Sequence, residues 1–189
     1  MLGRILSGEP AMGSNVYLVG MMGAGKTTVG KALARKTGLE FVDTDRLLVE
    51  RTGVPVATIF EFEGEAGFRR RETAMIAEVA GRSGCVVATG GGAVLSEENR
   101  RAMRASGTVV YLRARLESLW ERTRHDTSRP LLATPDPRAT LAALLEKRDP
   151  LYREAAHIVV DTGAQGASTL VNRVMAALQE HAAARGTTS

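Results

Sequence analysis

The stretch "NVYLVGMMGAGKTTVGKALARKTG", residues 15–38, decides the fold class of this chain. Its first part, 15–20, is a short apolar run that ends in glycine, which is typical of a buried strand. The segment 26–37 carries one apolar stripe and stops at Gly38, which predicts a helix. Between them, 20–27 matches the pattern G-x-x-x-x-G-K-[ST] in full. The stretch therefore predicts a strand, a glycine-rich loop and a helix in succession.

A loop of this kind is built to hold phosphate groups. Its glycines allow backbone angles and close approaches that side chains would block, so that N–H groups can point inward as an anion-binding nest. The helix that follows adds its positive N-terminal end. Lys26 is placed to reach the β- and γ-phosphates of a nucleotide, and the Thr27 hydroxyl is placed to bind Mg²⁺. The alternative is a chance glycine-rich turn. The predicted nucleotide-binding residues of the loop are Gly23, Ala24, Gly25, Lys26, Thr27 and Thr28.

The remainder of the chain alternates between strands and helices. Apolar runs at 40–42, 84–89, 108–112 and 157–161 predict four more strands, and helical patterns fill the gaps. Such alternation predicts an α/β fold in which helices cover both faces of a parallel sheet. Ligands of such sheets bind beyond the carboxyl ends of the strands.

The length of 189 residues is right for a single domain, which we expect to span 14–182 between flexible ends at 1–13 and 183–189. No apolar run approaches the roughly 18 residues of a membrane helix, and a long apolar segment typical of a secretory signal is missing from the first residues. Cys85 is the only cysteine, so an internal disulfide is excluded and a reducing cytoplasm fits.

The charge balance points to anionic ligands. The formal net charge is +4 and the pI is about 9.6, which is typical of proteins that bind nucleic acid, acidic membranes or small anions. The densest basic cluster is only Arg69–Arg71, without the long basic runs of nucleic-acid surfaces. Small anionic ligands are therefore favoured, and scattered solvated arginines account for most of the excess.

Two carboxylates follow the second predicted strand in "FVDTDRLL", residues 41–48. Residues i and i+2 of an extended strand point to the same face. If Asp43 and Asp45 lay deep in the sheet, both carboxylates would be buried and unpaired, at a cost on the order of several kcal/mol. At the carboxyl end of the strand they can face a metal or a ligand. Helix capping is the alternative, but it explains one acid and not two.

A nucleotide site also needs a carboxylate near its metal. The strand at 84–89 continues into "GGG" and offers no acid, so Asp43 is the best supplier, acting through a metal-bound water. Asp45 then lies further toward the open side. There it could accept a hydrogen bond from a substrate hydroxyl and take up the proton during transfer.

Glycines and arginines extend the candidate site. Gly90–Gly92 remove all side chains from one patch, which suggests that something packs against bare backbone; a flexible loop is the alternative. On the following helical pattern Arg69 borders the buried stripe and can enter a cleft, whereas Arg70 and Arg71 are expected to be solvated.

Two further segments are candidates on weaker grounds. The polar stretch 122–132 has no apolar periodicity and carries Arg129 near its end, which indicates a mobile lid. In "KRDPLYREAA", 147–156, Pro150 is expected to interrupt a helix and to place Arg153 just after it. Taken alone, Arg129 or Arg153 is more often a surface residue than a ligand.

Together these motifs resemble the shikimate kinase family. The matching segments are "GMMGAGKTTVG", "DTD", "GEAGFRRRE", "TGGGAV", "SRPLL" and "LYRE", in the order and spacing of the family over roughly 14–180. The resemblance implies transfer of the ATP γ-phosphate to the 3-hydroxyl of shikimate, which gives shikimate 3-phosphate and ADP on the route to chorismate and the aromatic amino acids. It also implies the P-loop fold of nucleoside-monophosphate kinases: a five-stranded parallel sheet of order 2-3-1-4-5, flanked by helices, with a lid.

The resemblance also implies roles for individual residues. Asp45, Lys26 and Arg129 would be catalytic. The Asp45 carboxylate would bind the substrate hydroxyls and serve as the general base. Thr27 and Asp43 would serve magnesium. Arg69 and Arg153 would bind the shikimate carboxylate, and Gly90, Gly91 and Gly92 would contact its ring. Arg129 would reach the phosphates, and Arg122 would lie against adenine. No ligand is assigned in 162–168, which varies within the family.

The implied protein is a cytoplasmic monomer that binds shikimate and Mg-ATP, with neither nucleic acid nor membrane as a partner. Two rival functions stay open. One is a kinase of the same fold that acts on another polyol acid, such as gluconate. The other is a non-catalytic module that binds nucleotide or nucleic acid, which the intact Lys26, Thr27, Asp45 and Arg129 oppose.

Overall fold

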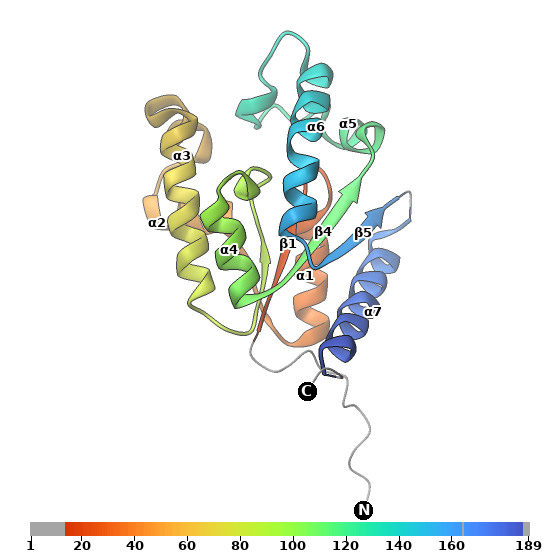
Figure 1. Cartoon of the computed structure of the whole chain (residues 1–189). Coiled ribbons are helices and arrows are strands. Elements are labelled where there is room, and N and C mark those ends of the chain that lie inside the picture. The colour runs from red at the N-terminus through yellow and green to blue at the C-terminus, as the bar shows by residue number, and fades with distance from the viewer. Residues whose placement is uncertain (1–13, 164, 187–189) are drawn as a thin grey trace, which may run out of the picture.

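A computed structural model describes residues 14–163 and 165–186. The predicted flexible segment 1–13 and the last residues, 187–189, lie outside the described residues. The chain forms a five-stranded sheet in the order β2-β3-β1-β4-β5, and neighbouring strands are parallel throughout. The predicted fold class and strand order are confirmed (Figure 1).

The strands occur at the five predicted places, with ends that differ from the prediction by at most two residues. Their bounds are Asn15–Val19 for β1, Glu40–Asp43 for β2, Cys85–Ala88 for β3, Gly107–Ala114 for β4 and Ile158–Thr162 for β5.

Helices cover both faces of the sheet. Helices α1 and α7 pack together on one face, while α4 and α6 pack on the other beside α3. The bounds are Lys26–Thr37 for α1, Thr44–Thr52 for α2, Val56–Ala80 for α3, Glu97–Ser106 for α4, Leu116–Thr123 for α5, Pro137–Ala155 for α6 and Ala167–Gly186 for α7. Short 3₁₀ helices are η1, Ala93–Leu95, and η2, Pro130–Leu132. None of the helices in 14–163 and 165–186 combines the length and apolarity that a membrane span requires.

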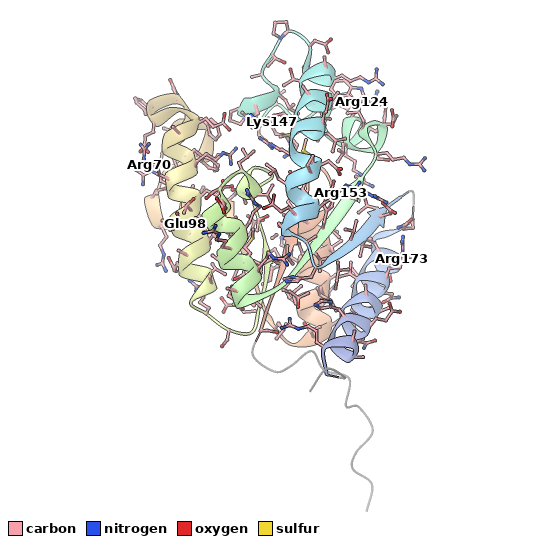
Figure 2. All side chains as sticks on the ribbon, viewed as in Figure 1. Arg70, Glu98, Arg124, Lys147, Arg153 and Arg173 are labelled. Atoms are coloured by element: carbon pink, nitrogen blue, oxygen red, sulfur yellow. The ribbon has the colours of Figure 1, made fainter. Side chains whose placement is uncertain are left out.

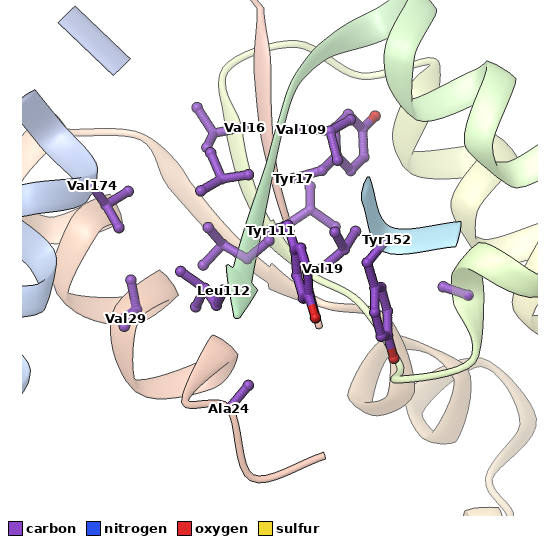
Figure 3. Close-up of a cluster of buried hydrophobic side chains, with 14 of the residues drawn as sticks. Val16, Tyr17, Val19, Ala24, Val29, Val109, Tyr111, Leu112, Tyr152 and Val174 are labelled. Carbon is purple, nitrogen blue, oxygen red and sulfur yellow. The ribbon is translucent and has the colours of Figure 1, made fainter. Parts of the chain in front are cut away.

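The core lies on both sides of the central strands. All of β1 and β3 is buried, because helices shield both faces, and this explains why their sequences are continuous apolar runs and do not alternate. Figure 3 shows part of this cluster, in which Val29 of α1 and Val174 of α7 lie on one side of the strands and Tyr152 of α6 on the other.

A buried asparagine ties together the amino ends of the strands. The Asn15 side chain donates to the carbonyl oxygens of Val79 at 3.2 Å and Arg82 at 3.1 Å, and it accepts from the N–H of Cys85 at 3.0 Å. It also donates to the Tyr17 hydroxyl at 3.2 Å. This end of the sheet is therefore joined to the end of α3 by polar contacts, far from the loop that follows β1.

Two local predictions were wrong. Helix α6 continues through Pro150 to Ala155, because buried residues before and after the proline, such as Leu141 and Tyr152, pack against the core and outweigh one lost backbone hydrogen bond. Helix α7 extends to Gly186, since its alanine-rich end has high helix propensity, so the expected tail at 183–186 is helical. The segment 122–132 begins inside α5 and ends in η2, and its mobility stays a prediction.

Candidate active site

Two adjacent cavities open at the carboxyl end of the sheet. The first, named here the P-loop cavity, has a volume of about 240 Å³ and is lined by Met22, Gly23, Gly25, Lys26, Thr27, Thr28, Asp43, Asp45, Thr89, Gly90, Gly91 and Arg129. The second, named the arginine cavity, has a volume of about 250 Å³ and is lined by Met22, Asp45, Val56, Phe60, Phe68, Arg69, Glu72, Gly90, Gly91, Gly92, Ser128, Arg129, Pro130, Leu131 and Arg148. They share Met22, Asp45, Gly90, Gly91 and Arg129.

The loop between β1 and α1 has the backbone that its glycines permit. Gly20 has a φ of 146°, and a Cβ there would lie 2.7 Å from the carbonyl oxygen of Leu112. Gly25 caps α1 with a φ of 96°, in the left-handed region. A larger residue would be strained at either position, so the loop is a fixed cradle at the N-terminus of α1 and not a chance turn.

Lys26 lies within this cradle. Its Nζ donates to the carbonyl oxygens of Gly20 at 2.7 Å and Met21 at 2.9 Å. Burial lowers the pKa of Lys26 to about 8, although the nearby carboxylates of Asp45 and Asp43 act in the opposite direction. An incoming anion would favour the charged ammonium and draw it away from these carbonyls.

Asp43 is both a helix cap and a partner of Thr27. One carboxylate oxygen accepts from the N–H groups of Asp45 at 3.1 Å and Arg46 at 3.2 Å, which caps α2. The other accepts from the Thr27 hydroxyl at 3.0 Å. The capping alternative is thus correct for one oxygen of Asp43, while the second oxygen faces the position where Thr27 was expected to bind a metal.

Asp45 lines the cavities from a helix, whereas we predicted that it would do so from the end of a strand. It is the second residue of α2 and not a strand residue, because the cap at Asp43 starts the helix at Thr44. The side chain nevertheless lines both cavities. Burial, and then the charge of Asp43, raises the pKa of Asp45, although Lys26 acts against them. A carboxylate with a raised pKa is a better proton acceptor.

The three consecutive glycines leave room for charged side chains from α3 and α6 to approach the backbone. A Cβ on Gly90 would lie 2.5 Å from Oε1 of Glu72, and one on Gly92 would lie 2.3 Å from Cζ of Arg69. A Cβ on Gly91 would lie 3.6 Å from Nη1 of Arg148. Such close approaches exclude side chains at 90 and 92 without rearrangement, so charged side chains of α3 and α6 lie against this bare backbone.

The three successive arginines of α3 differ as predicted. The Arg69 side chain is 19% exposed, lines the arginine cavity and donates from Nη1 to Oε2 of Glu72 at 2.7 Å. Arg70 and Arg71 are exposed, and Arg71 forms an ion pair with Glu63 at 2.6 Å on the surface. Of these three arginines, only Arg69 can therefore contact a ligand in the cavity.

Two buried charged residues of the arginine cavity were missed. Arg148 is 1% exposed, and its Nε and Nη1 have no hydrogen-bond partner within the described part of the chain. Glu72 is 2% exposed, and burial raises its pKa despite the opposing Arg69. A signal existed for Arg148, since it follows Leu141 by two helical turns on the buried stripe of α6. The expected helix break at Pro150 concealed it.

Arg153 does not reach either cavity. Its side chain is 48% exposed and its Nε contacts Oδ2 of Asp149 at 2.6 Å; Figure 2 shows it on α6. Five residues of an α-helix turn the side chain by roughly 140° relative to Arg148. The same helix therefore places Arg148 in the cavity and Arg153 on the surface.

The predicted lid supplies Arg129 to the junction of the cavities. Arg129 lines both cavities, and its Nε lies 2.7 Å from Oδ2 of Asp126 within the same segment. At the start of the segment, Nη1 of Arg122 donates to the carbonyl oxygen of Gly23 at 3.0 Å. The segment thus contacts the phosphate-binding loop at one end and the arginine cavity at the other.

The chain matches one family over most of its length. The family model described as shikimate kinase matches residues 22–179. A shikimate kinase of Nitrosospira multiformis is 57% identical over 157 residues, which cover 83% of this chain and 80% of the relative. A shikimate kinase of Ralstonia nicotianae is 58% identical over 166 residues, which cover 88% and 87%.

Solved structures agree with this assignment. A shikimate kinase from Acinetobacter baumannii in complex with shikimate is 46% identical, with a TM-score of 0.84 over 86% of this chain and 90% of that one. A gluconokinase from Sinorhizobium meliloti is 23% identical, with a TM-score of 0.64 over 96% and 98%, a likeness that extends to the fold alone.

Proposed function

Because this chain belongs to the shikimate kinase family, an ATP-dependent family of small-molecule kinases, we propose the following assignment of its reaction to its residues. The reaction is transfer of the γ-phosphate of ATP to the 3-hydroxyl of shikimate. One observation carries the assignment: the P-loop cavity and the arginine cavity meet at Asp45 and Arg129. A donor and an acceptor bound in the two cavities would face each other across these two side chains.

The P-loop cavity is assigned to Mg-ATP. Gly23, Ala24, Gly25, Lys26, Thr27 and Thr28 would hold the phosphates, with Arg129 beside them and Arg122 against the adenine. Thr27 and Asp43 fit a magnesium site, since their oxygens lie 3.0 Å apart at the cavity wall. No group of three or more His, Cys, Asp or Glu that could hold a metal occurs within 14–163 and 165–186, but Mg²⁺ needs only one or two carboxylates together with phosphates and water.

The arginine cavity is assigned to shikimate. Besides Arg129 at the junction, the guanidinium groups of Arg69 and Arg148 line it, and such groups bind carboxylates through charge-assisted hydrogen bonds. We propose Arg148 in place of Arg153 as the second contact of the shikimate carboxylate, because Arg153 lines neither cavity. Gly90, Gly91 and Gly92 form the wall against the ring, and Asp45 accepts from the substrate hydroxyls.

The chemistry then follows from these positions. Asp45 takes the proton as the 3-hydroxyl oxygen forms its bond to the γ-phosphorus, and the bond from that phosphorus to the bridging oxygen of ADP breaks. Lys26 and Arg129 stabilise the negative charge on the transferring group, which has a loose transition state that depends on positioning and charge. Magnesium, when bound, neutralises further phosphate charge.

Gluconate is the second candidate acceptor, because a gluconokinase shares the fold. The test is release of ADP, measured by a coupled assay with Mg-ATP and either shikimate or gluconate as acceptor. We expect turnover with shikimate and a much lower kcat/KM with gluconate. Well-folded protein that releases no ADP with shikimate would refute the proposed function.

The remaining proposals concern the state of the protein in the cell. We propose that it works as a monomer in the cytoplasm, with no nucleic acid or membrane partner. The single predicted domain and the scattered distribution of the positive charge support these proposals. Salt-sensitive binding to DNA or RNA without ATP turnover would instead favour a non-catalytic binding module.

A further inference from the structure

Tyr152 contacts the glycine wall of the arginine cavity from behind. The residue is 0% exposed, it lines neither cavity, and its hydroxyl donates to the carbonyl oxygen of Gly91. Tyr152 follows Arg148 by four residues on α6, so both side chains lie on the buried face of the helix. The proposed mechanism gives this buried hydroxyl no task.

The ring of Tyr152 is held in place by a second tyrosine. The rings of Tyr111 and Tyr152 are stacked with centroids 4.9 Å apart, as Figure 3 shows. The Tyr111 hydroxyl donates to Oδ1 of Asp149 at 2.8 Å, and this bond fixes the Tyr111 ring to α6. Burial raises the pKa of the Tyr152 hydroxyl, so it stays protonated and remains a donor.

The contact with Gly91 also fixes its neighbour. The carbonyl of Gly91 and the N–H of Gly92 belong to one planar trans peptide and point in opposite directions. Tyr152 holds the carbonyl on the core side, so the N–H of Gly92 is directed away from the core. Gly92 lines the arginine cavity beside the Arg69 guanidinium, and within the described part of the chain its N–H donates no hydrogen bond.

The two peptides before this one, Thr89–Gly90 and Gly90–Gly91, have separate supports. The N–H of Gly90 donates to the Thr44 hydroxyl at 3.2 Å, and the carbonyl of Gly90 accepts from Ala93 at 3.1 Å. Loss of the Tyr152 hydroxyl would therefore release the Gly91–Gly92 peptide and leave the start of the glycine segment in place.

We propose that Tyr152 is a positioning residue that directs the Gly92 N–H at the acceptor carboxylate between Arg69 and Arg148. This inference rests on the proposed function, because it needs an acceptor with a carboxylate in the arginine cavity. The N–H adds a directional donor to two charged side chains, and so it selects for the position of the carboxylate as well as for its charge.

The first experiment compares Tyr152→Phe with Tyr17→Phe. Tyr17 is also 0% exposed and its hydroxyl is hydrogen bonded to Ser106 Oγ at 2.7 Å, but it lies away from both cavities. We expect Tyr152→Phe to raise the KM for shikimate roughly 5- to 20-fold, about the effect of one lost hydrogen bond to a charged group, with the KM for ATP within about twofold. Tyr17→Phe should change neither KM, even where both variants lower the melting temperature.

An uncharged acceptor separates positioning from general damage. The inhibition constant of methyl shikimate, in which the carboxylate is esterified, is measured against shikimate turnover for the wild type and Tyr152→Phe. We expect it to change less than about twofold, since the ester lacks the charge that strengthens the hydrogen bond. An equal loss for shikimate and its methyl ester, or an unchanged KM for shikimate, overturns the inference. Absence of turnover in the wild type instead rejects the proposed function and the inference with it.

A second measurement uses the wild-type protein and is independent of any variant's folding. Gly–Gly peptide bonds occur only at 90–91 and 91–92, so protein labelled with both carbonyl-¹³C glycine and ¹⁵N glycine gives two correlated amide signals. Shikimate should move one of them, that of Gly92, strongly downfield, and methyl shikimate should move it far less. Equal small shifts of both signals with the two ligands would contradict a directed Gly92 N–H.

Discussion

Asp43 and Asp45 differ in role because the chain changes from strand to helix between them. Asp43 ends β2, and its carboxylate is already bonded to Thr27 and to two N–H groups of α2. Asp45 belongs to α2, is partly buried and has a raised pKa. One acid is thus held next to the proposed metal site, and the other is left as a proton acceptor at the junction of the cavities.

The first prediction separates these acids. Asp43→Asn should raise the magnesium concentration needed for half-maximal rate, because the charge next to Thr27 is lost, while the KM for shikimate stays close to normal. Asp45→Asn should lower kcat by about 10²–10⁴, the usual range for loss of a positioned base, with magnesium and ATP dependence near wild type. Steady-state rates measured against magnesium, ATP and shikimate give the comparison.

The outcomes are easy to tell apart. A disturbed shikimate KM in Asp43→Asn together with a disturbed magnesium dependence in Asp45→Asn would mean that the roles are reversed. If neither variant changes kcat more than about threefold, well below the range for a lost base, the aspartates serve only to start the helix.

At the scale of elements, α6 is the helix that completes the acceptor site. It carries Arg148 and Tyr152 on its buried face and Arg153 on its exposed face. The helix stays continuous across Pro150, and this continuity sets the angle between the three side chains. A helix that ended at the proline would have left that angle undetermined.

The second prediction compares the arginines of α6 and α3. Arg148→Ala and Arg69→Ala should each weaken shikimate binding by about 1.5–3 kcal/mol, roughly 10- to 150-fold, the range for a hydrogen bond to a charged group. ATP affinity should change little. Arg153→Ala and Arg70→Ala are the controls, since both side chains are exposed, and they should be near neutral. Dissociation constants from titration calorimetry decide the matter.

A larger loss of shikimate affinity in Arg153→Ala than in Arg148→Ala would show that Arg153, and not Arg148, is the second contact of the shikimate carboxylate. A rise in the dissociation constant of ATP as large as that of shikimate would show that the arginine cavity does not belong to the acceptor.

The third prediction concerns the segment 122–132, which joins α5 to η2 and carries Arg129. We expect it to close over both substrates and to exclude water from the transferring group. Arg129→Ala should then lower kcat more than it raises either KM, because the charge acts mainly in the transition state. Hydrogen exchange of this segment should slow when both ligands are bound, and equal protection with and without ligands would count against closure.

At the scale of the whole molecule, the two ends of the sheet do different things. The carboxyl end carries both cavities, whereas the amino end is joined by the buried Asn15 to the last turn of α3 and to β3. Because the strands lie between these ends, the contacts that stabilise the fold are separated from those that bind ligands.

The fourth prediction tests this separation. Asn15→Ala removes the Asn15 partner of the Cys85 N–H and of the Arg82 carbonyl oxygen, at a cost of about 2–4 kcal/mol, whereas the Val79 carbonyl oxygen still accepts from the Arg82 N–H. The free energy of unfolding, measured by urea denaturation, should fall by that amount. Both KM values and kcat should stay within about twofold at a temperature where the variant is folded. A selective change in the KM for shikimate would show that the two ends are coupled.

The sequence by itself determined the fold class, the strand order through its family resemblance, the phosphate-binding loop, and the glycines at the carboxyl end of β3. Apart from the strand order, these features are local: each depends on a short run of residues whose backbone preferences or apolar periodicity are visible in the sequence. The same holds for Arg69, because its distance from the buried stripe of α3 is fixed by helical periodicity.

Only the tertiary structure decided which residues of α6 face the acceptor cavity. Local rules expect a helix to stop at Pro150, but burial of the residues on either side stabilises the continuous helix, and this places Arg148 and Tyr152 inward and Arg153 outward. The partners of Gly90, Gly91 and Gly92 were likewise fixed by contacts between α3, α6 and the loop after β3. Such contacts join residues up to 61 positions apart, and no local pattern encodes a contact whose energy comes from packing distant segments together.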